Sequence, residues 1–184
     1  MGKQYEAIEG RLAEFVRAQP VFFVATAPDG PDGHVNLSPK GGTGTIRLLD
    51  ERTLAYLDYT GSGVETIAHL RQNGRITLMW CAFEGPPKIV RVHGRGEPVF
   101  PDDPRFDPLV RDFGDVSTLG VRAVIRIEAE RISDSCGYGV PFMGYTADRP
   151  TMRQWAEKKG AEKLVAYQEE KNLASIDGLP GLPA

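Results

Sequence analysis

Runs of β-branched and aromatic residues follow one another along most of the chain, with few helical segments between them. These runs cover residues 21–27, 34–38, 45–49, 53–58, 75–83, 88–94 and 121–130. A doubly wound parallel sheet would need a crossover helix after nearly every strand. The pattern of six or so strands therefore predicts a mainly β (α+β) fold, an antiparallel β-barrel with peripheral helices.

Turn residues and alternation support this interpretation. Residues 28–33 and 84–87 are rich in Pro and Gly, and each group separates two strand-like runs, as in a hairpin. From Val121 to Glu130 apolar and charged residues alternate, which is typical of a long strand with one dry face and one wet face. The sequence thus predicts two hairpins and a long strand that completes the sheet.

Helical patterns are confined to a few segments. Apolar residues, Tyr5 and Leu12 among them, recur at helical spacing until Pro20, so a first helix is expected over residues 1–19. A second is expected at 64–73, where Ser62 and Glu65 have the spacing of a capping box and Gly74 ends the pattern.

Three further segments complete the chain. Residues 101–114 form either a short helix or an ordered loop. Residues 149–171 have a helical pattern with a break at Gly160, and residues 179–184 are expected to form a loose tail.

Length and charge limit the function classes. A chain of 184 residues is expected to form one domain, residues 1–184, with its core at about 21–132. Lys and Arg number 22 against 25 Asp and Glu, a net charge of −3 that gives no field strong enough to gather nucleic acid or an anionic membrane. No apolar run approaches the roughly 18 to 20 residues of a spanning helix, and the N-terminus lacks the apolar core of a secretory signal, so we expect a cytoplasmic protein.

Cysteine and histidine give little support for a metal site or a hydrolase. Cys81 and Cys136 lie far apart, outside any paired metal-ligand spacing, and Cys81 falls in an apolar run where a buried thiol is expected. His34, His69 and His93 occur in no His-Glu-x-x-His or nucleophile-elbow pattern, so structural or solvated roles are favoured for them. No nucleotide-binding glycine fingerprint is present either.

The stretch from Asp58 to Gly63 is the most informative for binding. It runs from a predicted strand into a predicted helix, and its two glycines let a ligand approach the backbone closely. A helix N-terminus offers free N–H groups and the positive end of the helix dipole, so a phosphate group would fit. The hydroxyls of Thr60 and Ser62 could add hydrogen bonds, although Ser62 could equally serve only as the cap of its own helix.

Two other stretches carry polar groups in strand-like sequence. Asn36, Ser38 and Lys40 share one face of an extended chain by their period of two, either as a binding surface or simply as an exposed strand face. Arg91 shares a face with Ile89 and His93, where its guanidinium could pair with phosphate.

Taken in order, residues 23–27, 35–41, 54–63, 76–83 and 90–96 resemble the pyridoxamine 5′-phosphate oxidase-like, FMN-binding split barrel superfamily over about Val21 to Val99. The resemblance implies a six-stranded antiparallel split β-barrel, a homodimer, and one FMN in each of two clefts at the subunit interface. It assigns cofactor binding to residues in the three stretches described above: Asn36, Ser38, Pro39, Lys40, Gly41, Tyr59, Thr60, Ser62, Gly63 and Arg91.

The chain also departs from the true oxidase. Val35 stands where the oxidase has an arginine, Ser62-Gly63 where it has an Arg-Lys pair, and Ile89 where it has a glutamine. The tryptophan-containing dimer strand and the Arg-x-His substrate motif are replaced by residues 135–144, so the sequence argues against vitamin B6 oxidation. This replacement loop, with Tyr138 and Phe142, could cover a flat ring or only seal the end of the barrel.

The sequence therefore predicts an FMN-dependent oxidoreductase that uses the flavin for two-electron redox chemistry on an unidentified small molecule. No catalytic side chain is nominated, because the isoalloxazine ring itself transfers the electrons. Two alternatives remain: a reductase that holds the deazaflavin F420 on the same fold, and a non-enzymatic module that stores or senses flavin or haem.

Overall fold

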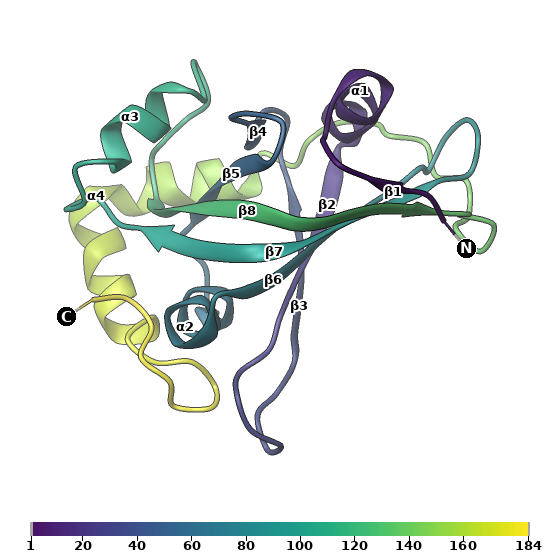
Figure 1. The fold of residues 1–184 in the computed structure, drawn as a ribbon. Coiled ribbons are helices and arrows are strands. Elements are labelled where there is room, and N and C mark those ends of the chain that lie inside the picture. Colours follow the sequence, from purple (N-terminus) through teal and green to yellow (C-terminus); the bar gives the residue numbers. More distant parts are fainter. Residues whose placement is uncertain (1, 184) are drawn as a thin grey trace.

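The computed structural model describes residues 2–183, and in them the chain folds into one twisted antiparallel sheet with helices around it (Figure 1). The strands are β1 (Gln4–Tyr5), β2 (Val21–Thr26), β3 (Asn36–Gly41), β4 (Ile46–Leu48), β5 (Thr53–Tyr59), β6 (Arg75–Cys81), β7 (Ile89–Val99) and β8 (Val121–Ser135). The helices are α1 (Gly10–Ala18), α2 (Glu65–Asn73), α3 (Phe106–Arg111) and α4 (Thr151–Lys171). No helix among these residues is both long enough and apolar enough to cross a membrane.

The sheet has the strand order β3-β2-β6-β7-β8-β5-β4, and β1 pairs with β8. Every pairing is antiparallel. The predicted number of six strands holds for the strands of six or more residues, and the difference arises from β1 and β4, which have only two and three residues. Short strands of this kind make few ladder bonds and leave little signal in the sequence.

The two edges of this sheet are brought together, which curls it into a split barrel. β3 and β4 follow one another in sequence but lie at opposite ends of the strand order. The turn between them joins the edges: the Thr45 hydroxyl donates to the Gly41 carbonyl at 3.1 Å, and Leu57 N–H donates to the Thr45 carbonyl at 3.0 Å. Polar groups of β3 and β5 therefore face each other across the open seam of the barrel.

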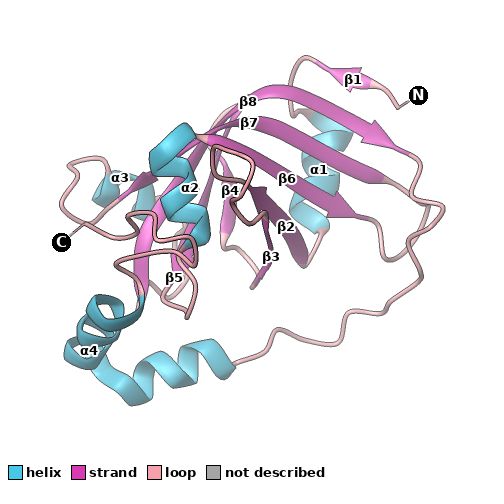
Figure 2. Cartoon of the chain, turned by 90° about the horizontal axis from the view of Figure 1, so that it is seen from below, coloured by secondary structure: helices cyan, strands magenta, loops and turns pink. Residues whose placement is uncertain are grey.

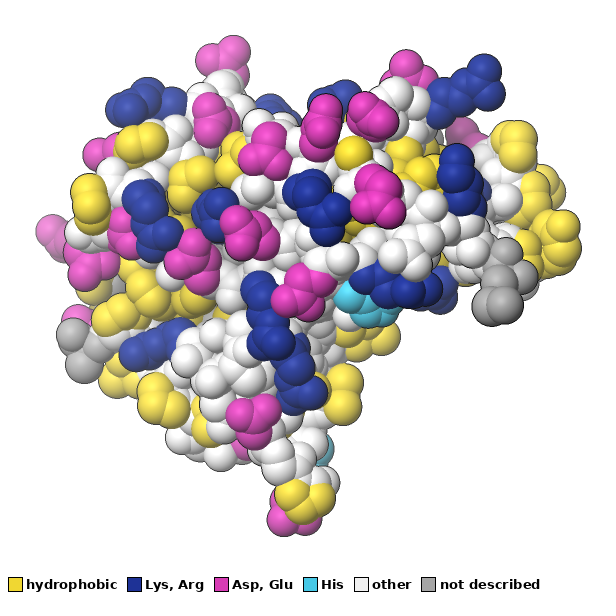
Figure 3. All heavy atoms as spheres, viewed as in Figure 1, with side chains coloured by type: hydrophobic (Ala, Val, Ile, Leu, Met, Phe, Trp, Pro, Cys, Tyr) yellow, Lys and Arg dark blue, Asp and Glu magenta, His cyan; other side chains and the backbone are white. Residues whose placement is uncertain are grey.

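Apolar side chains fill the barrel on its inner side and a smaller space outside it. Leu78, Trp80 and Val92 are fully buried in the inner cluster, against which α1 and α2 also pack. A second cluster around Phe113 lies between α3 and the outer side of β5 and β8. On the face shown in Figure 3, basic and acidic side chains are interspersed, as the small net charge suggests.

The prediction of one helix over residues 1–19 is wrong for residues 2–9, and Met1 lies outside the described residues. Tyr5 lies in β1, where its hydroxyl donates to Asp134 at 2.6 Å, and α1 begins only at Gly10. The apolar spacing persists across the break because Tyr5 and Ile8 still pack toward the inner cluster. Apolar residues that pack against one core can thus show helical spacing in the sequence although they do not all lie in a helix.

The predicted capping box is also wrong, and the predicted loose tail is held in place over residues 179–183, while Ala184 lies outside the described residues. The N-cap of α2 is Val64 and no side chain caps it, so Ser62 lies too early in the chain to serve as the cap, whereas Gly74 ends the helix with a φ of 70° as expected. At the other end of the chain Gly181 is buried, its carbonyl accepts from Arg71, and Leu182 N–H donates to the Asn172 carbonyl at 2.8 Å.

The remaining helical predictions are confirmed. Residues 101–114 contain the short helix α3, and α4 breaks at Gly160, whose φ of 73° is not helical. Figure 2 shows the two halves of α4 lying to one side of the sheet, joined to the end of β8 by a long loop.

Candidate functional site

The inner face of β3 carries a chain of polar contacts. Asn36 donates to the hydroxyls of Thr26 and Thr66 at 3.1 and 3.0 Å, and Ser38 donates to the Asn36 side-chain oxygen at 2.8 Å. Asn36, Ser38 and Lys40 do share a face, but it is half-buried and turned into the barrel rather than an exposed strand face. The shared face was predictable from the period of two, whereas its burial depends on the curl of the sheet.

Lys40 ends this row in a buried ionic cluster. Its Nζ lies 2.9 Å from one carboxylate oxygen of Asp58, and Nε of Arg122 lies 2.8 Å from the other. Burial raises the pKa of the Asp58 carboxyl, but the two neighbouring cations together lower it by more, so the pKa lies below its ordinary value. The cluster holds two cations against one carboxylate and so carries a net positive charge.

Sequence reasoning missed Arg122 because a β-bulge places it. Asp58 pairs with Ala123 and Tyr59 with Val121, so Arg122 is the extra residue of the bulge. Bulges re-aim side chains, and here Val121 packs outside the barrel while Arg122 turns toward Asp58 and donates to the Gly63 carbonyl at 2.7 Å. The face of β8 that was predicted to be solvent-exposed is therefore buried at its first charged residue, Arg122.

A cavity of about 440 Å³ opens where the start of β3 meets the N-terminus of α2. We call it the β3–α2 corner; its lining is His34, Val35, Asn36, Leu37, Ser62, Gly63, Glu65 and Ile176. Of the residues predicted to bind a cofactor, Asn36, Ser62 and Gly63 meet here. A side chain added at Gly61 would contact only the Tyr59 carbonyl, at 4.0 Å, so the backbone that leads into the corner is open.

Acidic groups border the same corner. The Glu65 carboxylate lies over Gly63, where it is favourably placed at the positive end of α2. Asp177, in the loop after α4, accepts from the backbone N–H of His34 and lies 2.6 Å from its Nδ1, and Ile176 N–H donates to Glu65 at 3.3 Å. The His34 contact lowers the pKa of the Asp177 carboxyl. The C-terminal loop thus closes one side of the corner.

Thr60 and Tyr59 do not face this corner. Both the N–H and the hydroxyl of Thr60 donate to the Gly120 carbonyl, at 2.7 and 2.8 Å, and Gln168 donates to the Thr60 hydroxyl. The Tyr59 hydroxyl donates to the Ser117 carbonyl outside the barrel. Their role in cofactor binding remains a prediction. It would require the hydroxyls of Tyr59 and Thr60 to give up these bonds and form new ones with the cofactor.

Arg91 and Pro39 lie on the outer face of the sheet. The register aligns Pro39, Phe23, Met79 and Arg91 across four neighbouring strands, and Gly41 is exposed at the end of β3. Nη1 of Arg91 donates to the Ser135 hydroxyl at 3.0 Å. Because β3 is an edge strand, a ligand that reaches both Lys40 and Arg91 would have to pass around that edge.

The histidines and cysteines form no further centre. His69 is buried with Nδ1 3.0 Å from the Thr26 hydroxyl, and burial lowers the pKa of its imidazole. His93 is exposed, Cys81 is buried, and Cys136 is exposed. Within residues 2–183 no three His, Cys, Asp or Glu side chains gather as metal ligands would.

The loop after β8 does not seal the barrel. Tyr138 and Phe142 are each 84% exposed, and the loop is held by a bond from Met143 N–H to the Phe83 carbonyl. The sealing role considered for residues 135–144 is therefore wrong for these aromatic side chains. Their role in covering a flat ring stays a prediction.

A family model described as pyridoxamine 5′-phosphate oxidase matches residues 8–136, from before α1 to the end of β8. This stretch includes every strand that contributes to the sites above. The chain belongs to the pyridoxamine 5′-phosphate oxidase family.

A relative in this family extends the match to nearly the whole chain. The pyridoxamine 5′-phosphate oxidase family protein ustO of Aspergillus flavus is 39% identical over 192 residues, which cover 97% of this chain and 77% of that protein. The similarity therefore includes α4 as well as the barrel.

Solved structures share the fold at lower identity. HupZ from Group A Streptococcus superposes with a TM-score of 0.54 at 22% identity, over 71% of this chain and 94% of HupZ. HutZ, the haem storage protein of Vibrio cholerae, gives 0.52 at 14% identity, over 72% and 98%. At these identities the likeness shows only that this chain shares their split-barrel fold.

Proposed function

We propose that the protein binds FMN with its phosphate at the β3–α2 corner and uses the flavin for two-electron redox of a small molecule. The observation that carries the proposal is the meeting of Asn36, Ser62 and Gly63 at the N-terminus of α2 in one cavity. These residues come from two of the stretches for which the family resemblance implies phosphate binding. Free N–H groups and the helix dipole favour an anion at this position.

Positive charge next to the corner, on the Asp58 cluster, supports the same ligand. Nη2 of Arg122 donates to the carbonyl of Gly63, which lines the corner. Arg122 and Lys40 together carry two positive charges against the single negative charge of Asp58. The Glu65 carboxylate now occupies the helix end, and as a flexible side chain it can rotate away when a phosphate group replaces it. The N–H groups at the start of α2, the open backbone at Gly61 and the positive charge of the Asp58 cluster thus fit a flavin phosphate.

When bound, the flavin would supply the hydride or electron transfer. The described residues then have the tasks of holding the phosphate, through Asn36, Ser62 and the backbone at Gly63, and of excluding water. Asp177 and Ile176 would shield the phosphate side, since their loop already lies against the corner.

We also propose a homodimer, with the outer face of β2, β3 and β6 in the interface. Leu37 is 66% exposed there, Val35 is 74% exposed, and Pro39 and Arg91 lie on the same face. An interface at this face would bring Arg91 and Pro39 to a flavin that passes around the edge of β3. A monomeric mass in solution, measured on protein that still retains flavin, would contradict this assembly.

The absorption spectrum of the purified protein, followed by denaturation and mass analysis of any released ligand, tests the cofactor. We expect the visible bands and green emission of oxidised FMN, with FMN in the supernatant. Absorption at shorter wavelength with release of F420, or a Soret band lost in a His34, His69 or His93 variant, would replace FMN by one of the two alternatives.

A filled corner tests the location of the site. Ser62 is exposed and lines the corner, so Ser62→Trp should block it and weaken FMN binding at least about tenfold, the equivalent of roughly 1.4 kcal/mol. Ser117→Trp is the matched control, since Ser117 is also exposed but lies outside the corner. Equal affinity of the two variants for FMN, measured by fluorescence titration, would place the flavin elsewhere.

A further inference from the structure

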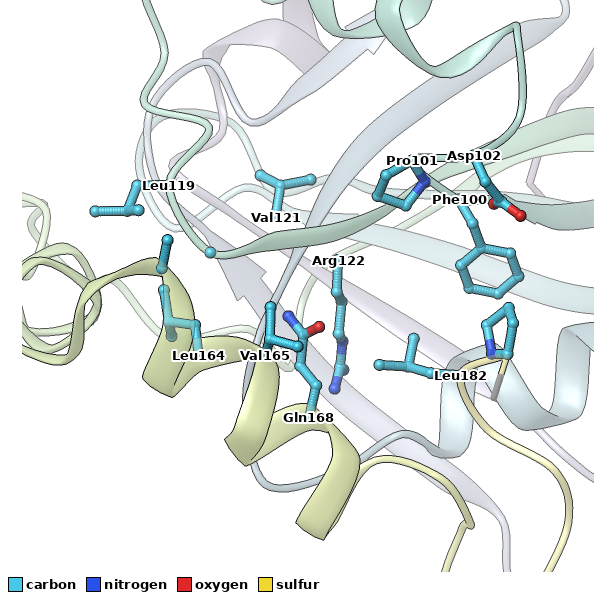
Figure 4. Close-up of a pocket in the computed structure, with 13 residues that line it drawn as sticks. Phe100, Pro101, Asp102, Leu119, Val121, Arg122, Leu164, Val165, Gln168 and Leu182 are labelled. Atoms are coloured by element: carbon cyan, nitrogen blue, oxygen red, sulfur yellow. The ribbon is translucent and has the colours of Figure 1, made fainter.

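A second cavity of about 420 Å³, lined in part by Arg122, lies between α4 and the start of β8 (Figure 4). Its walls are largely apolar and come from four parts of the chain: Phe100 after β7, Leu119 before β8, Leu164 and Val165 of α4, and Leu182 near the C-terminus. This volume lies within the range of small-ligand pockets. We call this cavity the α4 pocket.

One charged side chain lies among these apolar walls. Figure 4 shows the Arg122 side chain extending between Gln168 and Leu182. The Arg122 side chain is only 5% exposed, and its Nε and Nη2 are used by Asp58 and the Gly63 carbonyl. Its Nη1 is buried and has no hydrogen-bond partner among the residues that the structure describes. A buried guanidinium with unused N–H groups is costly unless something accepts from them.

Charge indicates which acceptor would suit Arg122. Asp58 must neutralise both Lys40 and Arg122, so the cluster has one positive charge in excess. An anion on Nη1 would balance this charge through a charge-assisted hydrogen bond, which is stronger than a bond to a neutral group. Asp102 at the rim of the same pocket is exposed and acidic, so it would repel a ligand with a second negative charge.

We propose that the α4 pocket binds a small apolar monocarboxylic acid, with the carboxylate on Nη1 of Arg122 and the hydrocarbon part against Leu164, Val165 and Leu182. The site is separate from the β3–α2 corner and does not depend on flavin binding. It nevertheless shares Arg122 with that corner, because Nη2 of the same guanidinium holds the Gly63 carbonyl.

The test is calorimetric titration of the full chain with benzoate, and with hexanoate as an aliphatic probe. Benzamide, the neutral analogue of benzoate, and succinate, a dianion, are the ligand controls. We expect saturable binding of benzoate or hexanoate, and affinity at least about tenfold weaker for benzamide and succinate because each lacks a favourable charge match. Absence of saturable binding of both monocarboxylates, or equal affinity for benzamide, would overturn the proposal.

Two substitutions on the same helix locate the binding. Ala161 is exposed and lines the α4 pocket, whereas Ala166 is exposed and does not. Ala161→Trp should fill the pocket and weaken benzoate binding at least about tenfold, while Ala166→Trp should leave it within about twofold of the unmodified chain. Equal loss or equal retention in both variants would show that benzoate binds elsewhere. Arg122 itself is left intact, since it also neutralises Asp58 and its removal would endanger the fold.

Discussion

The β3–α2 corner and the α4 pocket have nearly the same volume but different linings. The β3–α2 corner is lined by Asn36, Ser62 and the end of a helix, and solvent reaches it over exposed side chains. The α4 pocket is lined mainly by aliphatic residues around one buried cation. The comparison teaches that a single bulge residue can line one cavity and hold the backbone of another, because its guanidinium is planar and presents donors on more than one edge.

Removing the Asp58 carboxylate, which Lys40 and Arg122 share, should have the largest effect. Asp58→Asn leaves Lys40 and the buried Arg122 without compensation, so we expect the free energy of unfolding to fall by about 3–5 kcal/mol. Glu97→Gln is the control, because Glu97 pairs only with partly exposed arginines, and its loss should stay within about 1 kcal/mol. Urea unfolding measures both; similar values would show that the cluster is no more important than a surface ion pair.

The pH dependence of stability should show the same difference. Because the folded pKa of Asp58 lies below the unfolded value of about 3.9, its contribution is complete above that pH and is lost as the pH falls through the folded pKa. The gap in unfolding free energy between the unmodified chain and Asp58→Asn should therefore be constant from pH 7 to pH 5 and narrow only below about pH 4. A difference in unfolding free energy that narrows already at pH 6 would mean that another group has different pKa values in the folded and unfolded states.

The inner and outer faces of the sheet can be compared through FMN affinity. Lys40→Ala on the inner face and Arg91→Ala on the outer face should each weaken FMN binding by about 1.5 to 3 kcal/mol for a lost charge-assisted bond. Lys88→Ala is the control, since Lys88 is a partly exposed lysine that pairs with Asp134 instead. A loss in Lys40→Ala alone would confine the flavin to the inner face, and unchanged affinity in both would remove these residues from the site.

Much of the barrel could be predicted from the sequence because its strands are specified locally. The alternation in β8, the Pro and Gly turns of both hairpins, and Gly74 at the end of α2 each depend on neighbouring residues. The family resemblance then supplied the barrel closure, which no local pattern contains. Tyr5 was misassigned because packing against a common core preserved a helical spacing.

The candidate site was predictable only in its separate stretches. Asn36 and Ser62 were identified from strand period and turn chemistry, but which stretches meet depends on the curl of the sheet and on the C-terminal loop. The alternation in β8 predicts a solvated position for Arg122, and the prediction is wrong because a bulge reverses the period of two without changing the composition. The only sequence signal was a pair of opposite charges, Asp58 and Arg122, in two strands otherwise rich in apolar residues.

The comparison of FMN with riboflavin tests the central claim most directly, because the two ligands differ only by the phosphate. If the phosphate lies at the N-terminus of α2, FMN should bind at least about tenfold more tightly than riboflavin, and Ser62→Trp should abolish most of that advantage. Equal affinity of the unmodified chain for both ligands, by fluorescence titration, would contradict a phosphate site at the β3–α2 corner.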